Sequence, residues 1–270
     1  MSNNLLDRAR EDILSDVLSG TTDDLLLVSP SEATLVDLIG VLSEHEDGPR
    51  VDVLADAATI KNVMEDFIVA SKAADLLADD LLSLRASDSL ATNPLLITDA
   101  AVMTLVTTDS SVNGLTSEES AFVEDVRAEY RGQWDETEEY SLRTPPISEV
   151  NDGLAESLGE DAEGDFRAML DSLETARGDD RLDEVTVSLL VAAKNEALLY
   201  DISKWGEDTG VASKATFSRT KTQLEEKGLI ETEKVPIEVG RPRLRLTLAD
   251  RRLQSADSDQ IASAAQSILT

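Results

Sequence analysis

The sequence contains no cysteine, one histidine and only 3% aromatic residues. The lack of cysteine excludes disulfides and thiolate metal sites. No apolar run approaches the roughly 18 residues of a membrane span, and residues 1–15 lack the apolar segment of a signal peptide. We therefore expect a soluble, cytoplasmic protein that has no contact with a membrane.

Basic residues are also scarce. The chain has 24 Lys and Arg and 55 Asp and Glu, which gives a formal net charge of -31. Residues 201–252 are the exception, with 11 basic and 9 acidic residues, whereas the rest of the chain has 13 and 46. Carboxylates spread over every surface segment are typical of extreme halophiles, in which a Debye length of about 3 Å at 1 M salt screens their repulsion. The alternatives are an acidic mesophilic protein and an acidic DNA mimic, but mimicry requires charge concentrated on one face.

Length and apolar content set the expected organisation, since 270 residues with 41% hydrophobic residues suggest two domains with real cores. In residues 1–142, short apolar runs alternate with helical periodicity. We expect helices over residues 5–20, 31–42, 57–77 and 117–140, strands over 24–28, 51–54 and 81–85, and a hairpin over 95–107. Alternating strands and helices predict an α/β domain over residues 1–142 with a mostly parallel sheet.

Two consecutive prolines, Pro145 and Pro146, mark the boundary of this domain because proline blocks helix continuation. We expect a linker over residues 143–152. The pattern then becomes helical, and residues 153–270 are predicted to form a second domain with its core at 182–252 and a terminal helix over 257–269.

Residues 202–248 have the pattern of a winged helix-turn-helix. A first helix over 202–211 is followed by a second over 213–230, and a Gly-Arg-Pro-Arg sequence at 240–243 lies at the tip or return of a hairpin. Phe217 and Leu224 are two turns apart and would face one core, although Lys221 stands where an apolar residue is usual. A polar, serine-capped helix fits the major groove, and a basic hairpin suits the backbone or the minor groove. The predicted DNA contacts are Ser213, Lys214, Thr216, Ser218, Arg219, Lys221, Thr222, Arg241, Arg243 and Arg245.

The wing sequence at 240–246 and the helix sequence at 213–219 resemble the winged domains of archaeal transcription regulators. With the acidic bias and the α/β first half, the whole chain resembles the haloarchaeal TbsP type of regulator. The scheme of regulation in that type is similar to that of the sugar-sensing TrmB family. The resemblance implies control of central carbon metabolism genes, both sugar and gluconeogenic. The basic residues could instead form only a solvated face.

The first half also resembles the phospholipase D-like sensor domains of some archaeal regulators. Enzymes of that superfamily need a nucleophilic histidine, and the one histidine, His45, lies in a polar loop, where we expect a surface residue. We therefore expect a catalytically silent domain without cofactor or metal. Ligands bind at the carboxyl ends of parallel strands, so a metabolite effector would contact Ser29, Ser31, Asp56 and Asp99. A pure dimerisation platform is the alternative.

These observations favour a transcription regulator that binds double-stranded promoter DNA as a homodimer. The alternative from another class is a hydrolase or phosphotransfer enzyme whose winged module mediates protein interaction. The sequence argues against that alternative because it offers no nucleophile with an adjacent base and no glycine-rich phosphate loop.

Overall fold

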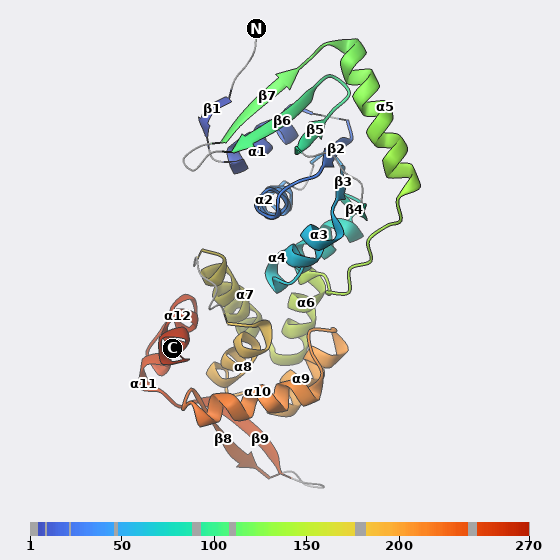
Figure 1. Cartoon of the computed structure of the whole chain (residues 1–270). Coiled ribbons are helices and arrows are strands. Elements are labelled where there is room, and N and C mark those ends of the chain that lie inside the picture. Colours follow the sequence, from blue (N-terminus) through green and yellow to red (C-terminus); the bar gives the residue numbers. More distant parts are fainter. Residues whose placement is uncertain are drawn as a thin grey trace. The chain divides into compact units, whose positions relative to one another are not determined.

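The computed structural model describes residues 5–8, 10–21, 23–45, 48–87, 93–107, 112–175, 182–236 and 242–269 (Figure 1). The chain divides into two units, Met1–Arg143 and Thr144–Thr270. Each unit has its own buried apolar core. Among the described helices, none combines the length and the apolar character needed to cross a bilayer.

A seven-stranded sheet with the order β1-β7-β6-β5-β2-β3-β4 forms the centre of the first unit. Strands β2, β3 and β4 pair in parallel. Strands β5 and β7 run in the opposite direction, and β6 and β1, which pair antiparallel with them, run in the direction of β2. Five of the seven strands therefore point the same way. The mostly parallel sheet is confirmed in this sense. The strands are β1 (Leu5–Arg8), β2 (Leu25–Val28), β3 (Val51–Ala55), β4 (Leu82–Ala86), β5 (Leu95–Ile97), β6 (Val102–Thr107) and β7 (Val112–Ser117).

Helices cover both faces of this sheet (Figure 1). On one face, Leu27 and Val53 join the larger core with side chains from α1 (Arg10–Gly20), α2 (Glu32–Ser43), α3 (Ala57–Val63) and α4 (Phe67–Ala78). On the other face, Leu26 and Leu54 pack with Trp134 of α5 (Ser120–Glu136). Side chains of one strand alternate between the two faces, which explains why the almost wholly apolar strands β2 and β3 can supply both cores.

The structure differs from the expected elements at four points. Residues Leu5–Arg8 form strand β1 rather than the start of a helix, and β7 was not expected. The helix expected over 57–77 is two helices, because the Asp66 carboxylate accepts hydrogen bonds from the amides of Ile68 and Val69 and so caps a new helix. Helix α5 begins at Ser120, after the expected start at residue 117, and Glu119 in the capping position makes no side-chain hydrogen bond.

In its described residues, the second unit is helical apart from a two-stranded sheet. Its first helix, α6, begins at Ile147, so the expected linker over 143–152 is wrong beyond Pro146. The elements are α6 (Ile147–Leu158), α7 (Glu160–Thr175), α8 (Glu184–Lys194), α9 (Leu199–Asp208), α10 (Lys214–Glu226), β8 (Ile230–Val235), β9 (Arg243–Leu248), α11 (Arg251–Gln254) and α12 (Ser258–Leu269).

Trp205 of α9 organises the core of the second unit. Its ring meets Phe166 of α7 and Phe217 of α10 edge-on, at centroid distances of 5.9 and 6.5 Å. Its indole N–H donates to the carbonyl of Val150 in α6 at 3.1 Å. Burying three aromatic rings against one another contributes more than their area alone. The first two helices of this unit therefore belong to the same packed body as the helix-turn-helix.

Candidate nucleic-acid interface

Helix α10 has the sequence features of a recognition helix. Gly210, at a φ of 82°, lies in the turn after α9, where a side chain would be strained. The Ser213 hydroxyl accepts a hydrogen bond from the Thr216 amide at 3.2 Å and caps the helix, as expected. Phe217 and Leu224 are buried, which confirms the predicted core face.

Five of the ten predicted DNA contacts are exposed on α10 or at its N-cap, while Thr216 and Lys221 are partly buried. Thr220, rather than Lys221, fills the core position after Phe217. The Lys221 side chain is only 13% exposed and its ammonium lies 2.6 Å from a carboxylate oxygen of Glu225. Burial of its stem with the charged end held by an acidic neighbour explains why a lysine is tolerated there. The exposed members of the set are Ser213, Lys214, Ser218, Arg219 and Thr222.

The wing is less basic than its sequence suggests. In the register of β8 and β9, Arg245 stands opposite Glu233, and Arg243 opposite Val235. Opposite charges at directly paired positions attract each other. The hairpin that the sequence predicts to be basic therefore places Glu233 directly beside Arg245. Arg241, the third arginine of the set, lies outside the described residues.

A groove of about 270 Å³ separates α10 from the wing and from the start of α9. Tyr200, 46% exposed, lies under the guanidinium of Arg243, whose Cζ is 3.8 Å from the ring centroid. Asp201 faces the same guanidinium at 3.5 Å. The groove is lined by Leu199, Tyr200, Ser203, Lys214, Ser218, Pro242, Arg243 and Leu244.

Tyr200 and Ser203 are absent from the predicted set of DNA contacts. The sequence pattern placed the start of the first helix at residue 202, whereas α9 begins at Leu199. Tyr200 therefore fell outside the motif. An aromatic residue just before the apolar helical pattern, with an arginine-rich hairpin downstream, is the signal that could have found it.

Carboxylates neutralise several cations around the groove. Lys214 of α10 pairs with Glu207 of α9, and Lys204 pairs with Asp208 one turn later. The hydrogen bond from Lys214 lowers the pKa of Glu207, and the same contact raises the pKa of Lys214. Both groups thus stay charged around neutral pH. DNA phosphate that binds Lys214 must take the place of an intramolecular carboxylate.

Tyr200→Ala is expected to weaken DNA binding about two- to fivefold, because an exposed cation–π contact contributes roughly 0.5–1 kcal/mol and holds Arg243 beside the groove. Tyr200→Phe keeps the ring face and is expected to bind almost as tightly as the native chain. Fluorescence anisotropy with labelled operator DNA measures both. A Tyr200→Phe loss as large as that of Tyr200→Ala would contradict the stacking role.

The predicted effector residues of the first unit do not form one group. Ser29 and Ser31 follow β2, and Asp56 follows β3, so the parallel pairing brings these three to one edge of the sheet. Asp99 follows β5, which runs antiparallel to β2, and therefore lies at the opposite edge. The grouping of Asp99 with the others is wrong. It forms an ion pair with Arg127 of α5 at 2.5 Å.

The three residues that do share an edge have local structural roles. Ser31 caps α2 through the Thr34 amide at 3.2 Å, and Asp56 caps α3 through the Ala58 amide at 2.8 Å. Ser29 has a φ of 51°, and its buried hydroxyl has no hydrogen-bond partner. A polar atom left unpaired and a strained backbone are features found at binding sites, but the two caps explain Ser31 and Asp56 without a ligand.

His45 is partly buried rather than a plain surface residue. Its ring N–H donates from Nδ1 to the Val41 carbonyl at 2.7 Å, at the end of α2. This hydrogen bond ties the imidazole to the last helical turn. His45 lies outside the strands. The phospholipase D resemblance would require a nucleophilic histidine in the strand region.

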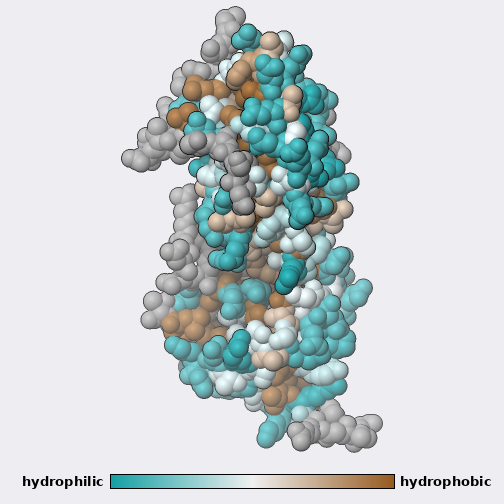
Figure 2. All heavy atoms as spheres, turned by 45° about the vertical axis from the view of Figure 1, so that its right-hand side comes forward, coloured by the Kyte–Doolittle hydropathy of each residue, from teal (hydrophilic) through white to brown (hydrophobic). Residues whose placement is uncertain are grey.

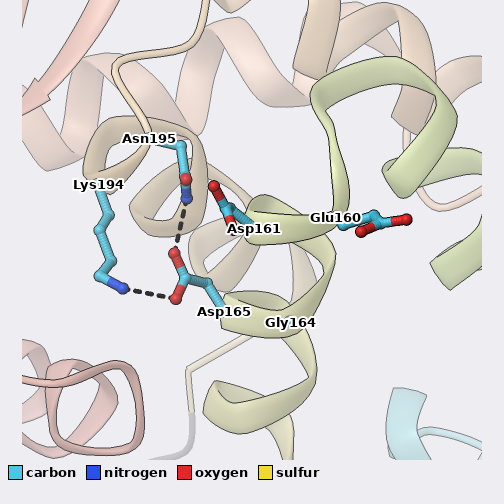
Figure 3. Close-up of a pocket in the computed structure, with 6 residues that line it drawn as sticks. All are labelled: Glu160, Asp161, Gly164, Asp165, Lys194 and Asn195. Atoms are coloured by element: carbon cyan, nitrogen blue, oxygen red, sulfur yellow. Dashed lines mark hydrogen bonds and ion pairs between the residues drawn. The ribbon is translucent and has the colours of Figure 1, made fainter.

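A second cavity, of about 490 Å³, lies between α7 and the end of α8 (Figure 3). The Asp165 carboxylate accepts hydrogen bonds from Lys194 at 2.5 Å, Asn195 at 2.8 Å and Ser258 at 2.5 Å. Burial opposes ionisation of Asp165, but these hydrogen bonds prevail and lower its pKa. The contacts join α7, α8 and α12. Within the described residues, no cluster of acidic, histidine or cysteine side chains could hold a metal ion.

Parts of the chain resemble several solved structures, among them the following two. An archaeal chromatin protein, TrmBL2, described as having a novel mode of DNA binding, is 17% identical, with a TM-score of 0.37 over 51% of this chain and 54% of that one. A phospholipase D family member, Nuc from Salmonella typhimurium, is 12% identical, with a TM-score of 0.35 over 52% of this chain and 99% of that one. The chain thus spans about half the length of TrmBL2. No curated protein matches it.

Two family models match consecutive parts of the chain. The N-terminal model of TbsP-like transcriptional regulators matches residues 2–145. The model of their C-terminal helix-turn-helix domain matches residues 146–266. The two matches meet close to the boundary between the two compact units. The chain belongs to the family of TbsP-like transcriptional regulators, with an N-terminal α/β domain and a C-terminal helix-turn-helix domain.

Proposed function

We propose that the protein is a sequence-specific regulator that binds promoter DNA through α10 and the wing. The observation that carries this proposal is the exposed face of α10, where hydroxyl side chains and Arg219 stand free of the core while Phe217 and Leu224 anchor the helix. A helix of this shape enters the major groove. Arg243 and Arg245 of the wing then contact backbone phosphates or the minor groove.

The targets we propose are genes of central carbon metabolism, both sugar and gluconeogenic, in the cytoplasm of a halophilic archaeon. Two observations support this setting. The helix and wing sequences resemble those of TbsP-type regulators, a resemblance that implies such genes, and the net charge of -31 suits molar intracellular salt. The strongly acidic surface would then hold water and cations instead of repelling itself.

A homodimer and an effector complete the proposal. Helix-turn-helix proteins read two half-sites with two copies of the recognition helix. The first unit would supply the dimer contact and, at the edge that carries Ser29, Ser31 and Asp56, a pocket for a small metabolite. An effector can alter DNA binding only through unequal affinity for two conformations of the protein.

Chromatin immunoprecipitation from cells grown with and without glucose tests this function. We expect enrichment at a limited set of promoters that share one sequence, with occupancy that changes with the carbon source. Purified protein should then bind that sequence in preference to a scrambled duplex. Uniform recovery of DNA, independent of sequence, would contradict a specific regulator.

The salt dependence of binding should be shallow. Each phosphate neutralised by a basic side chain contributes about -0.9 to the slope of log affinity against log salt. When phosphate takes Lys214, it leaves Glu207 as an unpaired carboxylate close to the DNA. That carboxylate takes up one cation from solution, which offsets one of the cations that the DNA releases on binding. Glu207→Gln removes this uptake, so we expect its slope to be steeper by about one.

The matched control is Glu226→Gln, which removes the same charge from an exposed position at the other end of α10. Anisotropy titrations from about 0.2 to 2 M KCl give the three slopes over a range in which long-range effects are screened. We expect the control to follow the native chain. Equal slopes for both variants would show that the Lys214 pair has no part in the salt response.

A further inference from the structure

The second face of the sheet is only partly covered by α5. The helix packs over the side of the sheet where Leu26, Leu54 and Ile97 lie. Beyond it, Val106 of β6 is 43% exposed and Leu115 of β7 is 51% exposed. Figure 2 shows apolar surface on the first unit beside the hydrophilic surface of its neighbours. The sheet therefore presents large apolar side chains outside either core.

The strand register places these side chains on one surface. Leu115 stands opposite Thr104, and Val106 stands opposite Asn113. Leu115 and Val106 are therefore diagonal neighbours on the same face. Phe122, 46% exposed in the first turn of α5, lies on a separate element and is flanked by the exposed residues Glu118, Glu119, Glu124 and Asp125. We call the pair of Val106 and Leu115 the apolar patch.

The charge pattern around the apolar patch is unlike the rest of the chain. Strands β6 and β7 contain no charged residue in twelve positions, whereas 29% of all residues are charged. A solvated strand face in this protein would be expected to carry carboxylates. The absence of charge together with exposed apolar side chains indicates a surface that is covered by another molecule.

We propose that the apolar patch is where two copies of the chain associate, a proposal that rests on the two-fold DNA recognition described above. Two copies that each carry a net charge of -31 repel each other wherever carboxylates meet. In a two-fold contact the same surface of each copy meets itself. An uncharged apolar surface is complementary to its own copy, whereas an acidic surface is not.

A dimer contact on this face would extend beyond the apolar patch. A stable dimer buries about 800 Å² on each partner. The apolar patch would form the centre of that area, and the partly exposed side chains of Thr104, Asn113 and Ser117 on the same face would form a polar rim. Apolar centres with polar rims are the usual composition of protein interfaces.

Leu115→Glu tests the proposal, with Val36→Glu as its matched control. Val36 is 37% exposed on α2, which covers the opposite face of the sheet. Light scattering after size exclusion in molar KCl should give twice the 29.2 kDa of one chain for the native protein and for the control. Leu115→Glu should be monomeric, with a dissociation constant raised at least a hundredfold. A native monomer, or a dimer unchanged by Leu115→Glu, overturns the proposal.

A gain of signal guards against a variant that fails to fold. The chain has no cysteine, so Leu115→Cys introduces a single thiol at the apolar patch. A short bifunctional thiol reagent should join two copies through Cys at this position, whereas Val36→Cys should stay uncoupled. Equal coupling at both positions would overturn the proposal. If the copies couple as expected but the native dimer binds no promoter, the DNA-binding function fails while the interface stands.

Discussion

Gly206→Ala is expected to destabilise the helix-turn-helix by about 1–3 kcal/mol, because overpacking a closed core forces side chains or backbone to move. A Cβ at Gly206 would lie 2.2 Å from Cε2 and 2.5 Å from Cζ of Phe217. Phe217 is fully buried and meets the Trp205 ring edge-on. Either the buried ring must move or α9 and α10 must separate.

Thermal unfolding of the full chain, followed by circular dichroism, measures the effect. A unit of this size loses roughly 2–8 °C for each kcal/mol. Gly164→Ala is the control, since Gly164 lies within α7 and no atom lies within 4 Å of its would-be Cβ. The control should be neutral or stabilising by up to about 1 kcal/mol through helix propensity.

A second substitution makes the cause of the instability testable. Phe217→Leu alone should destabilise the core by removing ring contacts. Combined with Gly206→Ala, it should cost less than the two single changes together, since the smaller side chain makes room for the new methyl group. Strict additivity of the two changes would contradict a direct clash between these positions.

The helix-turn-helix was predictable from sequence because its determinants are local. The cap at Ser213 and the spacing of Phe217 and Leu224 act within one helix, and the structure confirms them. The glycine at the turn, Gly210, is equally visible. By contrast, the start of α9 at Leu199 depends on packing, because Leu198 has no capping side chain and pairs instead with Arg245 of the wing.

Strands at the rim of the first sheet could not be predicted for a related reason. Strand β7 reads Val-Asn-Gly-Leu-Thr-Ser, which has neither a continuous apolar run nor regular alternation. It is a strand because β6 and β1 pair with it on both sides. The misplaced Asp99 has the same origin, since its position depends on the direction of β5, which only the assembled sheet determines.

Most ion pairs of the DNA-binding surface could not be predicted from the sequence either. The count of 11 basic and 9 acidic residues over 201–252 suggested a mildly basic unit. The structure pairs Lys214 with Glu207, Arg243 with Asp201 and Lys221 with Glu225. These pairs join residues 4 to 42 positions apart, so only the i, i+4 pair of α10 could be read from helical spacing.

Arg219 differs from these paired residues and is the position at which we expect the largest effect on DNA recognition. It is exposed on α10, and no carboxylate pairs with it in the part of the chain that the structure describes. Its five N–H donors remain available for a base edge. An arginine that contacts guanine through two hydrogen bonds contributes about 1–3 kcal/mol of discrimination, which is roughly a 5- to 150-fold preference for the correct site.

Arg219→Ala should therefore reduce operator affinity by that factor while changing affinity for scrambled DNA far less. Arg251→Ala is the matched control, because Arg251 is an exposed arginine on α11, outside the helix-turn-helix and wing. Paired titrations with operator and scrambled duplexes separate the two outcomes. A phosphate contact lowers both affinities together and flattens the salt slope, whereas a base contact removes mainly the difference between them. If Arg219→Ala retains the native preference for the operator, Arg219 does not read the sequence, and the specificity must come from the hydroxyl side chains of α10 or from the wing.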